Sequence, residues 1–177
     1  MPEDLETPRT LLRPFRPSDV EAAFGWFHDP EVMRFIPNGP DATLEASAAR
    51  ISRYLDHEAK FGFSKWIILD RVSGLPIGDS GFFYLPDMKR VELGYRLSKP
   101  WWGRGLATEV ACKWIQVAHP WYGFERVFAF AHPENPASLH VMEKVGFRYS
   151  HHEELYGTNS PLYAMDLTAR YSVCRAI

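Results

Sequence analysis

Hydrophobic and polar positions follow two different periods along this chain. Short apolar runs bounded by Pro, Gly, Asn or Asp are typical of strands, and apolar residues three or four positions apart are typical of helices. Helices are expected at 18–28, 41–59, 104–118 and 135–145. Strands are expected at 10–15, 64–70, 76–84, 91–97, 126–131, 147–155 and 161–167.

Two of the expected helices carry local signals. Ser18 and Glu21 have the spacing of a capping box, which predicts that Ser18 caps the first helix. In the second helix, Leu44, Ala48, Ile51 and Leu55 are spaced four, three and four residues apart. We expect these four side chains to form the buried stripe of that helix.

The lengths of the connections predict the topology. The turns near 73–74 and 86–87 are too short for crossovers, so the three central strands should form an antiparallel meander. Residues 91–131 are long enough for a right-handed parallel crossover through a helix. The expected fold class is α+β, a single domain over 1–177 with a core at about 9–168. Its central sheet is mixed and mostly antiparallel, with flanking helices. The tail 169–177 shows no clear period.

Composition and charge exclude several classes of protein. The 177 residues suit one domain, and the formal net charge of −2 argues against a strongly basic nucleic-acid binder. No apolar run approaches the roughly 20 residues needed to span a bilayer, and the first residues do not resemble a secretory signal. With only two cysteines and no Cys-x-x-Cys, a cytoplasmic location is the simplest expectation.

A glycine loop joins the strand expected at 91–97 to the helix that follows it. Gly103 and Gly105 flank Arg104, and glycine lets the backbone turn tightly and approach a ligand closely. The free N–H groups at a helix N-terminus favour an anion such as a diphosphate, and Arg104 can add a contact to phosphate. On this loop alone, a simple turn is an equally good interpretation. The loop matches neither a Rossmann fingerprint nor a P-loop.

Two sequence blocks resemble a known family. Trp-Trp-Gly103-Arg-Gly105-Leu-Ala-Thr-Glu109 resembles the acyl-CoA pyrophosphate loop of the GNAT N-acetyltransferases. The stretch from His132 to Phe147 resembles the Asn-x-x-Ser…Glu-Lys-x-Gly-Phe motif of the branch that includes the ribosomal-protein N-terminal acetyltransferases. The blocks stand in the family's order and spacing, and the resemblance extends over about 9–167. It implies the GNAT fold, with a splay between the strands expected at 91–97 and 126–131.

The resemblance also implies a binding site for acetyl-CoA. Backbone N–H groups of the glycine loop and the first helical turn would hold the diphosphate, and those near Leu97 would reach the pantetheine and the thioester carbonyl. Asn135 would contact the pantetheine arm, and Lys144 would reach the 3′-phosphate. The residues implied in cofactor binding are Leu97, Trp102, Gly103, Arg104, Gly105, Ala107, Thr108, Asn135 and Lys144.

Two of these assignments have structural alternatives. Asn is favoured at helix N-caps, and Pro136 stands at the first position of the expected helix, so Asn135 also suits a cap. Both roles can coexist, because the cap needs only one end of the amide. Lys144 also suits a solvated surface lysine.

The candidate catalytic residues are Glu92 and Ser138. A Glu on this strand is the general base in several GNAT branches, often through a water; alternation places Glu92 on the same face as Arg96. An ion pair with Arg96 or Arg90 is the alternative, and Glu153 and Glu154 are weaker candidate bases.

Ser138 can donate a proton to the leaving thiolate, although it can equally pack against the sheet. Many family members use a Tyr about two turns after the Asn, where this chain has Met142. Ser138, His140 or a water would have to replace it.

The sequence therefore predicts an acetyl-CoA-dependent N-acetyltransferase that transfers acetyl directly to a primary amine, either a protein N-terminus or a small molecule. A non-catalytic acyl-CoA-binding regulatory module is the alternative. We expect no metal, no nucleic acid and no membrane partner; a homodimer stays open. Trp26, Phe27, Phe35 and Trp66 are candidates for the wall of an acceptor groove, with core packing as the alternative for each.

Overall fold

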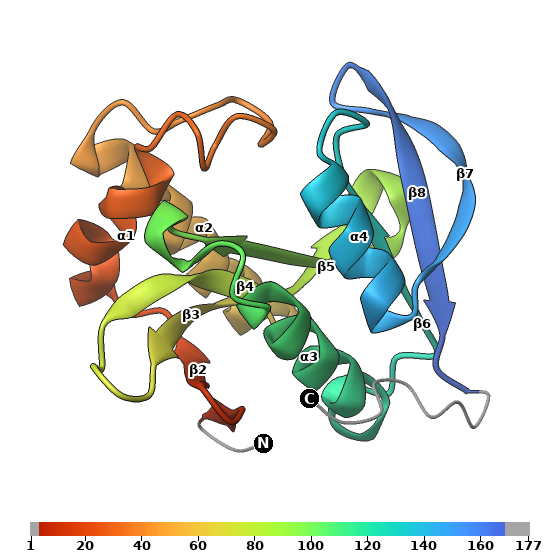
Figure 1. The fold of residues 1–177 in the computed structure, drawn as a ribbon, viewed down its shortest axis with the longest axis horizontal. Helices are drawn as coiled ribbons and strands as arrows, with labels where there is room; N and C mark the ends of the chain where they lie inside the picture. The colour runs from red at the N-terminus through yellow and green to blue at the C-terminus, as the bar shows by residue number, and fades with distance from the viewer. Residues whose placement is uncertain (1–3, 169–177) are drawn as a thin grey trace.

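A computed structural model describes residues 4–168. Most of the chain forms one sheet with helices packed on it (Figure 1). The strands are β1 (Leu5–Glu6), β2 (Thr10–Pro14), β3 (Lys65–Asp70), β4 (Pro76–Leu85), β5 (Arg90–Leu97), β6 (Arg126–Phe130), β7 (Arg148–Leu155) and β8 (Thr158–Asp166). The helices are α1 (Val20–Phe27), α2 (Leu44–Phe61), α3 (Leu106–Tyr122) and α4 (Pro136–Val145).

The sheet has the order β1-β2-β3-β4-β5-β6-β8-β7. Every neighbouring pair is antiparallel except β5 and β6, which α3 connects as a parallel crossover. The β5–β6 pair is registered at a single position, Glu92 opposite Phe128, whereas β4 and β5 pair over eight positions. The two central strands therefore part beyond Glu92. The α+β fold with a splayed central pair is confirmed.

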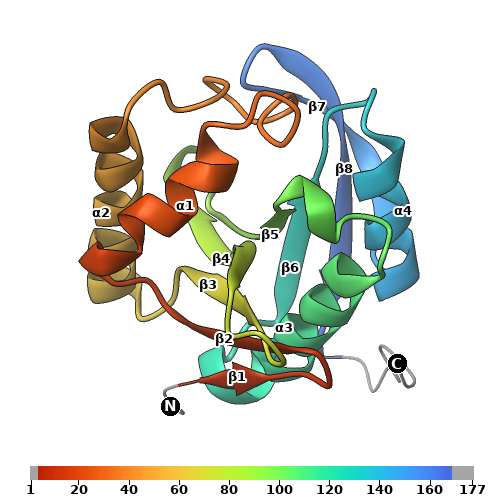
Figure 2. The ribbon, with the colours of Figure 1, turned by 60° about the vertical axis from the view of Figure 1, so that its left-hand side comes forward.

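The helices cover both faces of the sheet, and two hydrophobic clusters follow from this. In β3, Trp66 and Ile68 point to the cluster that includes α3, whereas Ile67 points to the cluster that includes α1 and α2. This alternation is the period of a strand that is buried on both faces. Figure 2 shows α1 and α2 together on one side of the molecule and α4 on the other.

The start of α1 differs from the prediction. Pro17–Asp19 is a short 3₁₀ helix, and Asp19 rather than Ser18 stands at the N-cap of α1. The Asp19 carboxylate accepts from the backbone N–H of Arg16 at 2.7 Å and forms an ion pair with Arg13 at 2.8 Å. The expected Ser18–Glu21 capping box is wrong, because Asp19 is the N-cap residue and its buried carboxylate accepts the hydrogen bonds of this turn.

The buried face of α2 is also rotated from the predicted one. Leu44 is 42% exposed and Ala48 is exposed, while Ile51 is buried. Polar side chains of α2 lie on the inner face instead of Leu44 and Ala48, and they contact distant residues that the sequence does not identify. The other residues that α2 buries are Ser47, Arg50, Tyr54 and His57.

Smaller differences concern the ends of elements. Helix α3 continues to Tyr122 instead of ending at 118. Pro120 lies in its last turns without ending it, and the aromatic residues after it pack on the core. The two-residue strand β1 was not predicted. The tail 169–177 lies outside the described residues. Over residues 4–168, no helix is long and apolar enough to cross a membrane.

Candidate active site

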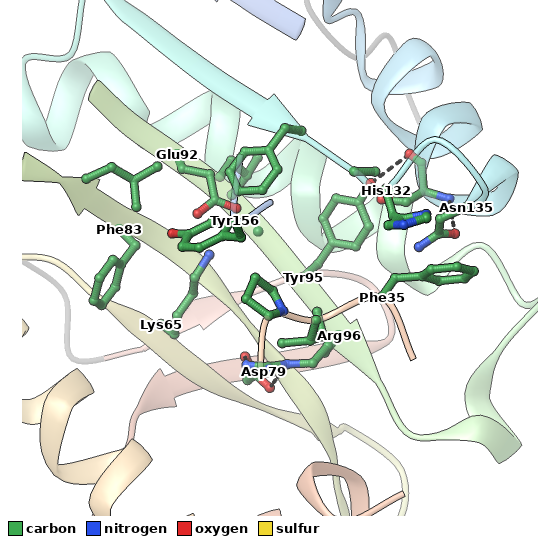
Figure 3. Close-up of a pocket in the computed structure, with 18 of the residues that line it drawn as sticks. Phe35, Lys65, Asp79, Phe83, Glu92, Tyr95, Arg96, His132, Asn135 and Tyr156 are labelled. Atoms are coloured by element: carbon green, nitrogen blue, oxygen red, sulfur yellow. Dashed lines mark hydrogen bonds and ion pairs between the residues drawn. The ribbon is translucent and has the colours of Figure 1, made fainter. Parts of the chain in front are cut away.

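A cavity of about 310 Å³ lies where β5 and β6 part (Figure 3). On one side it is lined by Glu92, Gly94 and Arg96, which share a face of β5. On the other it is lined by Tyr95 of β5 and by Ser138 of α4. Because successive residues of a strand point to opposite faces, the cavity passes through the sheet. Two reactants can therefore meet in it from opposite sides.

Glu92 lines this cavity, on the face of β5 that the alternation predicted, and it has no hydrogen bond or ion pair with another described residue. Neither of the ion pairs considered as the alternative to a catalytic role forms. Arg96 pairs instead with Asp79, which lies directly opposite it on β4, and Arg90 pairs with Glu153. The carboxylate of Glu92 is therefore free to interact with a ligand.

The Arg96–Asp79 pair forms a buried polar floor beside the cavity. Two guanidinium nitrogens of Arg96 donate to the two Asp79 oxygens, at 3.1 and 2.8 Å. The indole of Trp26 donates to Asp79 at 2.9 Å, and Arg96 also donates to the hydroxyl of Tyr54 at 2.7 Å. A bidentate pair with these further bonds has fixed geometry. These bonds thus link α1, α2, β4 and β5 beside the cavity.

Tyr95 is a site residue that sequence reasoning missed. Its hydroxyl donates to the carbonyl oxygen of Ser138 at 2.9 Å and lies 3.0 Å from the Ser138 Oγ. Burial raises the pKa of the Tyr95 phenol, so it keeps its proton at neutral pH. Met142, one turn after Ser138, lines the same cavity. Two hydroxyl groups therefore meet at the side of the cavity that Met142 lines, where the family resemblance led us to expect a Tyr.

Asn135 is a helix cap that also lines the cavity. Its Oδ1 accepts from the backbone N–H of Ser138 at 3.1 Å, so it caps α4. It also lines the cavity, and its side-chain amide nitrogen makes no hydrogen bond within residues 4–168. The capping bond uses the oxygen and leaves two N–H donors for a ligand.

The glycine loop lies outside the cavity, at the N-terminus of α3. Gly103 and Gly105 have φ values of +72° and +76°, a region that favours glycine, and Gly105 is the N-cap of α3. The first helical bond runs from the N–H of Glu109 to the carbonyl of Gly105. The N–H groups of 106–108, which include Ala107 and Thr108, precede it and have no partner in the helix. A Cβ at Gly103 would point into open space.

Glu109 holds this loop against the first strands. It is 3% exposed and accepts from the Thr7 hydroxyl at 2.6 Å and from the backbone and side chain of Arg9. Arg9 in turn donates to the carbonyl of Arg104 at 2.8 Å. Burial alone would raise the pKa of Glu109, but these donors more than compensate and lower it. The Glu of the glycine-loop motif is therefore an anchor of the loop.

The remaining predicted cofactor residues surround this loop or lie apart from it. The Trp102 indole donates to the Leu97 carbonyl at 2.6 Å, which ties the loop to the end of β5. Arg104 stacks over Trp101 at 4.9 Å and is exposed. Lys144 is exposed in the last turn of α4, at the opposite end from Asn135. Its contact with the 3′-phosphate stays a prediction.

Several weaker candidates do not reach the cavity. Glu154 and His140 are exposed and do not line it. Of the four aromatic residues considered for an acceptor wall, Phe35 lines the cavity, whereas Trp26, Phe27 and Trp66 are core residues. Sequence reasoning missed several lining residues, which include Lys65, Phe83, His132 and Tyr156. A lysine directly before the apolar run of β3 was a usable signal for the first of them.

No metal centre is found in the described part of the chain. Within residues 4–168, no three His, Cys, Asp or Glu side chains are grouped in a way that could hold an ion. The adjacent His151 and His152 are both exposed on β7.

Comparisons with known proteins indicate the family of this chain. A family model described as an acetyltransferase (GNAT) domain matches residues 9–148. A Bacillus subtilis protein described as the uncharacterized N-acetyltransferase YoaA is 31% identical over 146 residues, which are 81% of this chain and 82% of that protein. The uncharacterized B. subtilis protein YkkB is 30% identical over 149 residues, 82% of this chain and 86% of its own.

Solved structures share the fold. A GNAT-family acetyltransferase from Bacillus anthracis superposes with a TM-score of 0.80 at 22% identity, covering 93% of this chain and 98% of that one. A ribosomal-protein-S5-alanine acetyltransferase from Vibrio fischeri has a TM-score of 0.77 at 17% identity, covering 94% and 97%. At these identities the likeness shows the fold alone.

The chain belongs to the GNAT acetyltransferase family. It is therefore assigned to the acetyltransferases, whose members use acetyl-CoA as the acetyl donor.

The loop assignment predicts the effect of a side chain at Gly103. In Gly103→Glu, the carboxylate would stand where an anion is expected, so acetyl-CoA affinity should fall at least about tenfold, measured by calorimetry. Gly74→Glu is the matched control, because Gly74 has a φ of +71° and equally open surroundings in the β3–β4 turn. It should carry the same backbone strain and leave the affinity unchanged. Equal affinities in both variants would remove the loop from the cofactor site.

The two roles of Asn135 can be separated in the same way. Asn135→Ala should lose about 1 kcal/mol of stability as a cap, and should also weaken acetyl-CoA binding several-fold. Thr43→Ala is the matched control. The Thr43 side chain caps α2 by accepting from the N–H of Ala46 at 3.3 Å. This variant should lose similar stability without any change in affinity. If both variants bind acetyl-CoA like the parent protein, Asn135 is only a cap.

Proposed function

We propose that this protein is an acetyl-CoA-dependent N-acetyltransferase that transfers the acetyl group directly to a primary amine. The observation that carries the proposal is the cavity through the parted strands, with the unpaired carboxylate of Glu92 on one side and the hydroxyls of Tyr95 and Ser138 on the other. One side has a proton acceptor and the other has hydrogen-bond donors, as amine acetylation requires.

The cofactor residues fit the donor substrate. The unpartnered N–H groups at 106–108 and the open space at Gly103 suit a diphosphate, and the free amide of Asn135 suits the amides of pantetheine. Bound acetyl-CoA would supply the activated acetyl group. Arg104 and Lys144 would add charge to the phosphate groups.

The residues of the cavity then have separate roles. Glu92, directly or through a water, accepts a proton from the acceptor ammonium and leaves a neutral amine to attack. The hydroxyl of Ser138 donates to the leaving sulfur and stabilises its developing charge, while Tyr95, whose hydroxyl donates to the Ser138 carbonyl, holds Ser138 in position. The splay of β5 and β6 leaves backbone groups beyond Glu92 for the thioester carbonyl. No covalent enzyme intermediate is needed.

The acceptor is a protein N-terminus or a small-molecule amine, and the reaction is proposed to occur in the cytoplasm, where acetyl-CoA is available. A non-catalytic acyl-CoA-binding module is the other candidate. It would retain the loop and Asn135 but would not need an unpaired carboxylate in the cavity. The presence of free Glu92 favours catalysis.

Substitution of Glu92 tests catalysis separately from binding. Acetyl-CoA at about 100 times its Kd should add about 2.7 kcal/mol of stability, which raises the melting temperature of a chain of this size by several degrees. Glu92→Gln should keep that shift and lower turnover by about 100-fold or more with any accepted amine.

Glu154→Gln is the control for this experiment, because Glu154 is exposed and lies outside the cavity. It should behave like the parent protein. A melting-temperature shift without acetylation of any amine in a broad panel would establish the binding module instead.

Removal of the Ser138 hydroxyl tests the role of this residue. Ser138→Ala should lower kcat about tenfold or more while acetyl-CoA affinity changes little, because only the developing negative charge needs the donor. Tyr95→Phe removes the neighbouring hydroxyl and should act in the same direction. An unchanged kcat in Ser138→Ala would reduce Ser138 to a packing residue.

A further inference from the structure

Lys65 is a buried cation that the proposed reaction does not use. It begins β3, is 9% exposed and lines the cavity. Its Nζ donates to the carbonyl of Gly81 at 2.9 Å, and this is its only hydrogen bond within residues 4–168. It makes no ion pair with a described carboxylate. Two of its three N–H donors are therefore available inside the cavity.

Lys65 and Glu92 lie at the same place above the central strand. The Lys65 Nζ is 2.3 Å, and the Glu92 Oε1 is 3.1 Å, from the point where a Cβ of Gly94 would stand. Glycine at position 94 therefore makes room for both groups. Figure 3 shows the Lys65 and Glu92 side chains directed toward each other across this space. The cavity thus presents an acidic and a basic group that are close together but not bonded.

The other charges that line the cavity are already paired, with one exception. Arg96 is paired with Asp79, and Arg50 with Asp41 at 2.6 Å. Arg53, exposed on α2, lines the cavity and has no ion pair with a described residue. Glu92 is therefore the single unpaired carboxylate in a lining that contains two unpaired cations. Such a site does not complement a polyamine, but it does complement an amine that also carries a carboxylate.

The rest of the wall is largely apolar and includes several aromatic rings. Rings from the α1–α2 connection, α2, β4, β6 and the β7–β8 turn enclose the cavity, and its volume of about 310 Å³ is that of a small-molecule site. The aromatic residues other than Tyr95 and His132 are Phe35, Tyr54, Phe83, Phe130 and Tyr156.

We propose that the acceptor is a free α-amino acid with an apolar or aromatic side chain, whose amine faces Glu92 and whose carboxylate is bound by Lys65. In an α-amino acid a single carbon joins the two groups, which matches a basic and an acidic side chain that meet above Gly94. The apolar side chain would lie against the aromatic wall. This inference rests on the proposed N-acetyltransferase function and specifies its acceptor.

The carboxylate of the acceptor would also stabilise the charged form of Lys65. A buried ammonium with one hydrogen bond and no carboxylate in direct contact is unfavourable, because it has lost most of its hydration and the nearby charges of Glu92 and Asp79 offset this only in part. Burial accordingly lowers the pKa of Lys65 in the ligand-free protein. A bound carboxylate would place an opposite charge in direct contact with Lys65, and the resulting charge-assisted bond is strong and specific.

The proposed reaction yields an N-acetyl amino acid and CoA. The C–N bond to the acetyl group forms as the thioester C–S bond breaks. The acceptor ammonium loses two protons. Glu92 accepts one of them, and the other balances the proton that the departing sulfur takes up. Lys65 remains protonated on the carboxylate throughout and is a binding residue.

Matched acceptors test the inference with the unmodified protein. Each α-amino acid of an apolar and aromatic panel, such as leucine, methionine and phenylalanine, is compared with its amide and its decarboxylated amine, and spermidine is added. At least one amino acid should have a kcat/KM about tenfold or more above those of its amide and amine, because only the acid offers a carboxylate to Lys65. The amides also represent a protein N-terminus, which has no carboxylate on that carbon. Equal or higher kcat/KM for the amides, or for spermidine, would overturn the inference.

Substitution at Lys65 tests the assigned partner of the carboxylate. Lys65→Met retains the length of the side chain without its charge and should bring the acid-to-amide ratio close to one, with acetyl-CoA affinity unchanged. Lys60→Met, which removes an exposed lysine of α2, should leave that ratio as in the parent protein. If Lys65→Met does not fold, the acceptor comparison in the unmodified protein still decides the substrate class.

Other outcomes have distinct meanings. An equal loss of turnover for acid, amide and amine in Lys65→Met would make Lys65 a proton acceptor and overturn the inference. Loss of the acid preference in Arg53→Gln but not in Lys65→Met would place the carboxylate at the cavity mouth, against an α-amino acid. Acetylation of amines without acid preference would leave the proposed function intact and refute only the acceptor. Absence of both acetylation and acetyl-CoA binding would refute both.

Discussion

The arrangement of the site depends on the separation of two neighbouring parallel strands. β5 and β6 are registered only at Glu92 and Phe128, and they part beyond that point. A continuous sheet would separate its two faces completely. The parted strands instead allow one cavity to include Glu92 and Gly94 from one face and Tyr95 and Ser138 from the other. Donor and acceptor can thus approach the same point from opposite sides of the sheet.

Buried polar groups hold the two sides of this opening in place. The Arg96–Asp79 pair joins β4 and β5 and bonds to side chains from α1 and α2. Glu109 joins α3 to the first strands through Thr7 and Arg9. These carboxylates are fully occupied by donors, whereas Glu92 is not. The contrast between satisfied and unsatisfied carboxylates separates the structural acids from the proposed catalytic one.

Much of the fold and of the glycine loop could be predicted from the sequence, because both depend on local signals. The period of apolar residues indicated most of the helices and strands, and glycines at 103 and 105 predicted a backbone turn at a helix N-terminus. Predictions that depended on which neighbour a side chain meets were weaker. Ser18 does not cap α1, Leu44 and Ala48 are not buried, and Arg96 binds Asp79 rather than Glu92.

The sequence by itself determined the alternation of β5, which places Glu92, Gly94 and Arg96 on one face, and the capping chemistry of Asn135. Only the tertiary structure decided that Lys65, almost 30 positions earlier in the chain, would stand beside Glu92, and that Tyr95 would meet Ser138. The physical reason is the range of the interactions. Periodicity and caps act over a few residues, whereas register between strands and the space left by a glycine depend on contacts between distant segments.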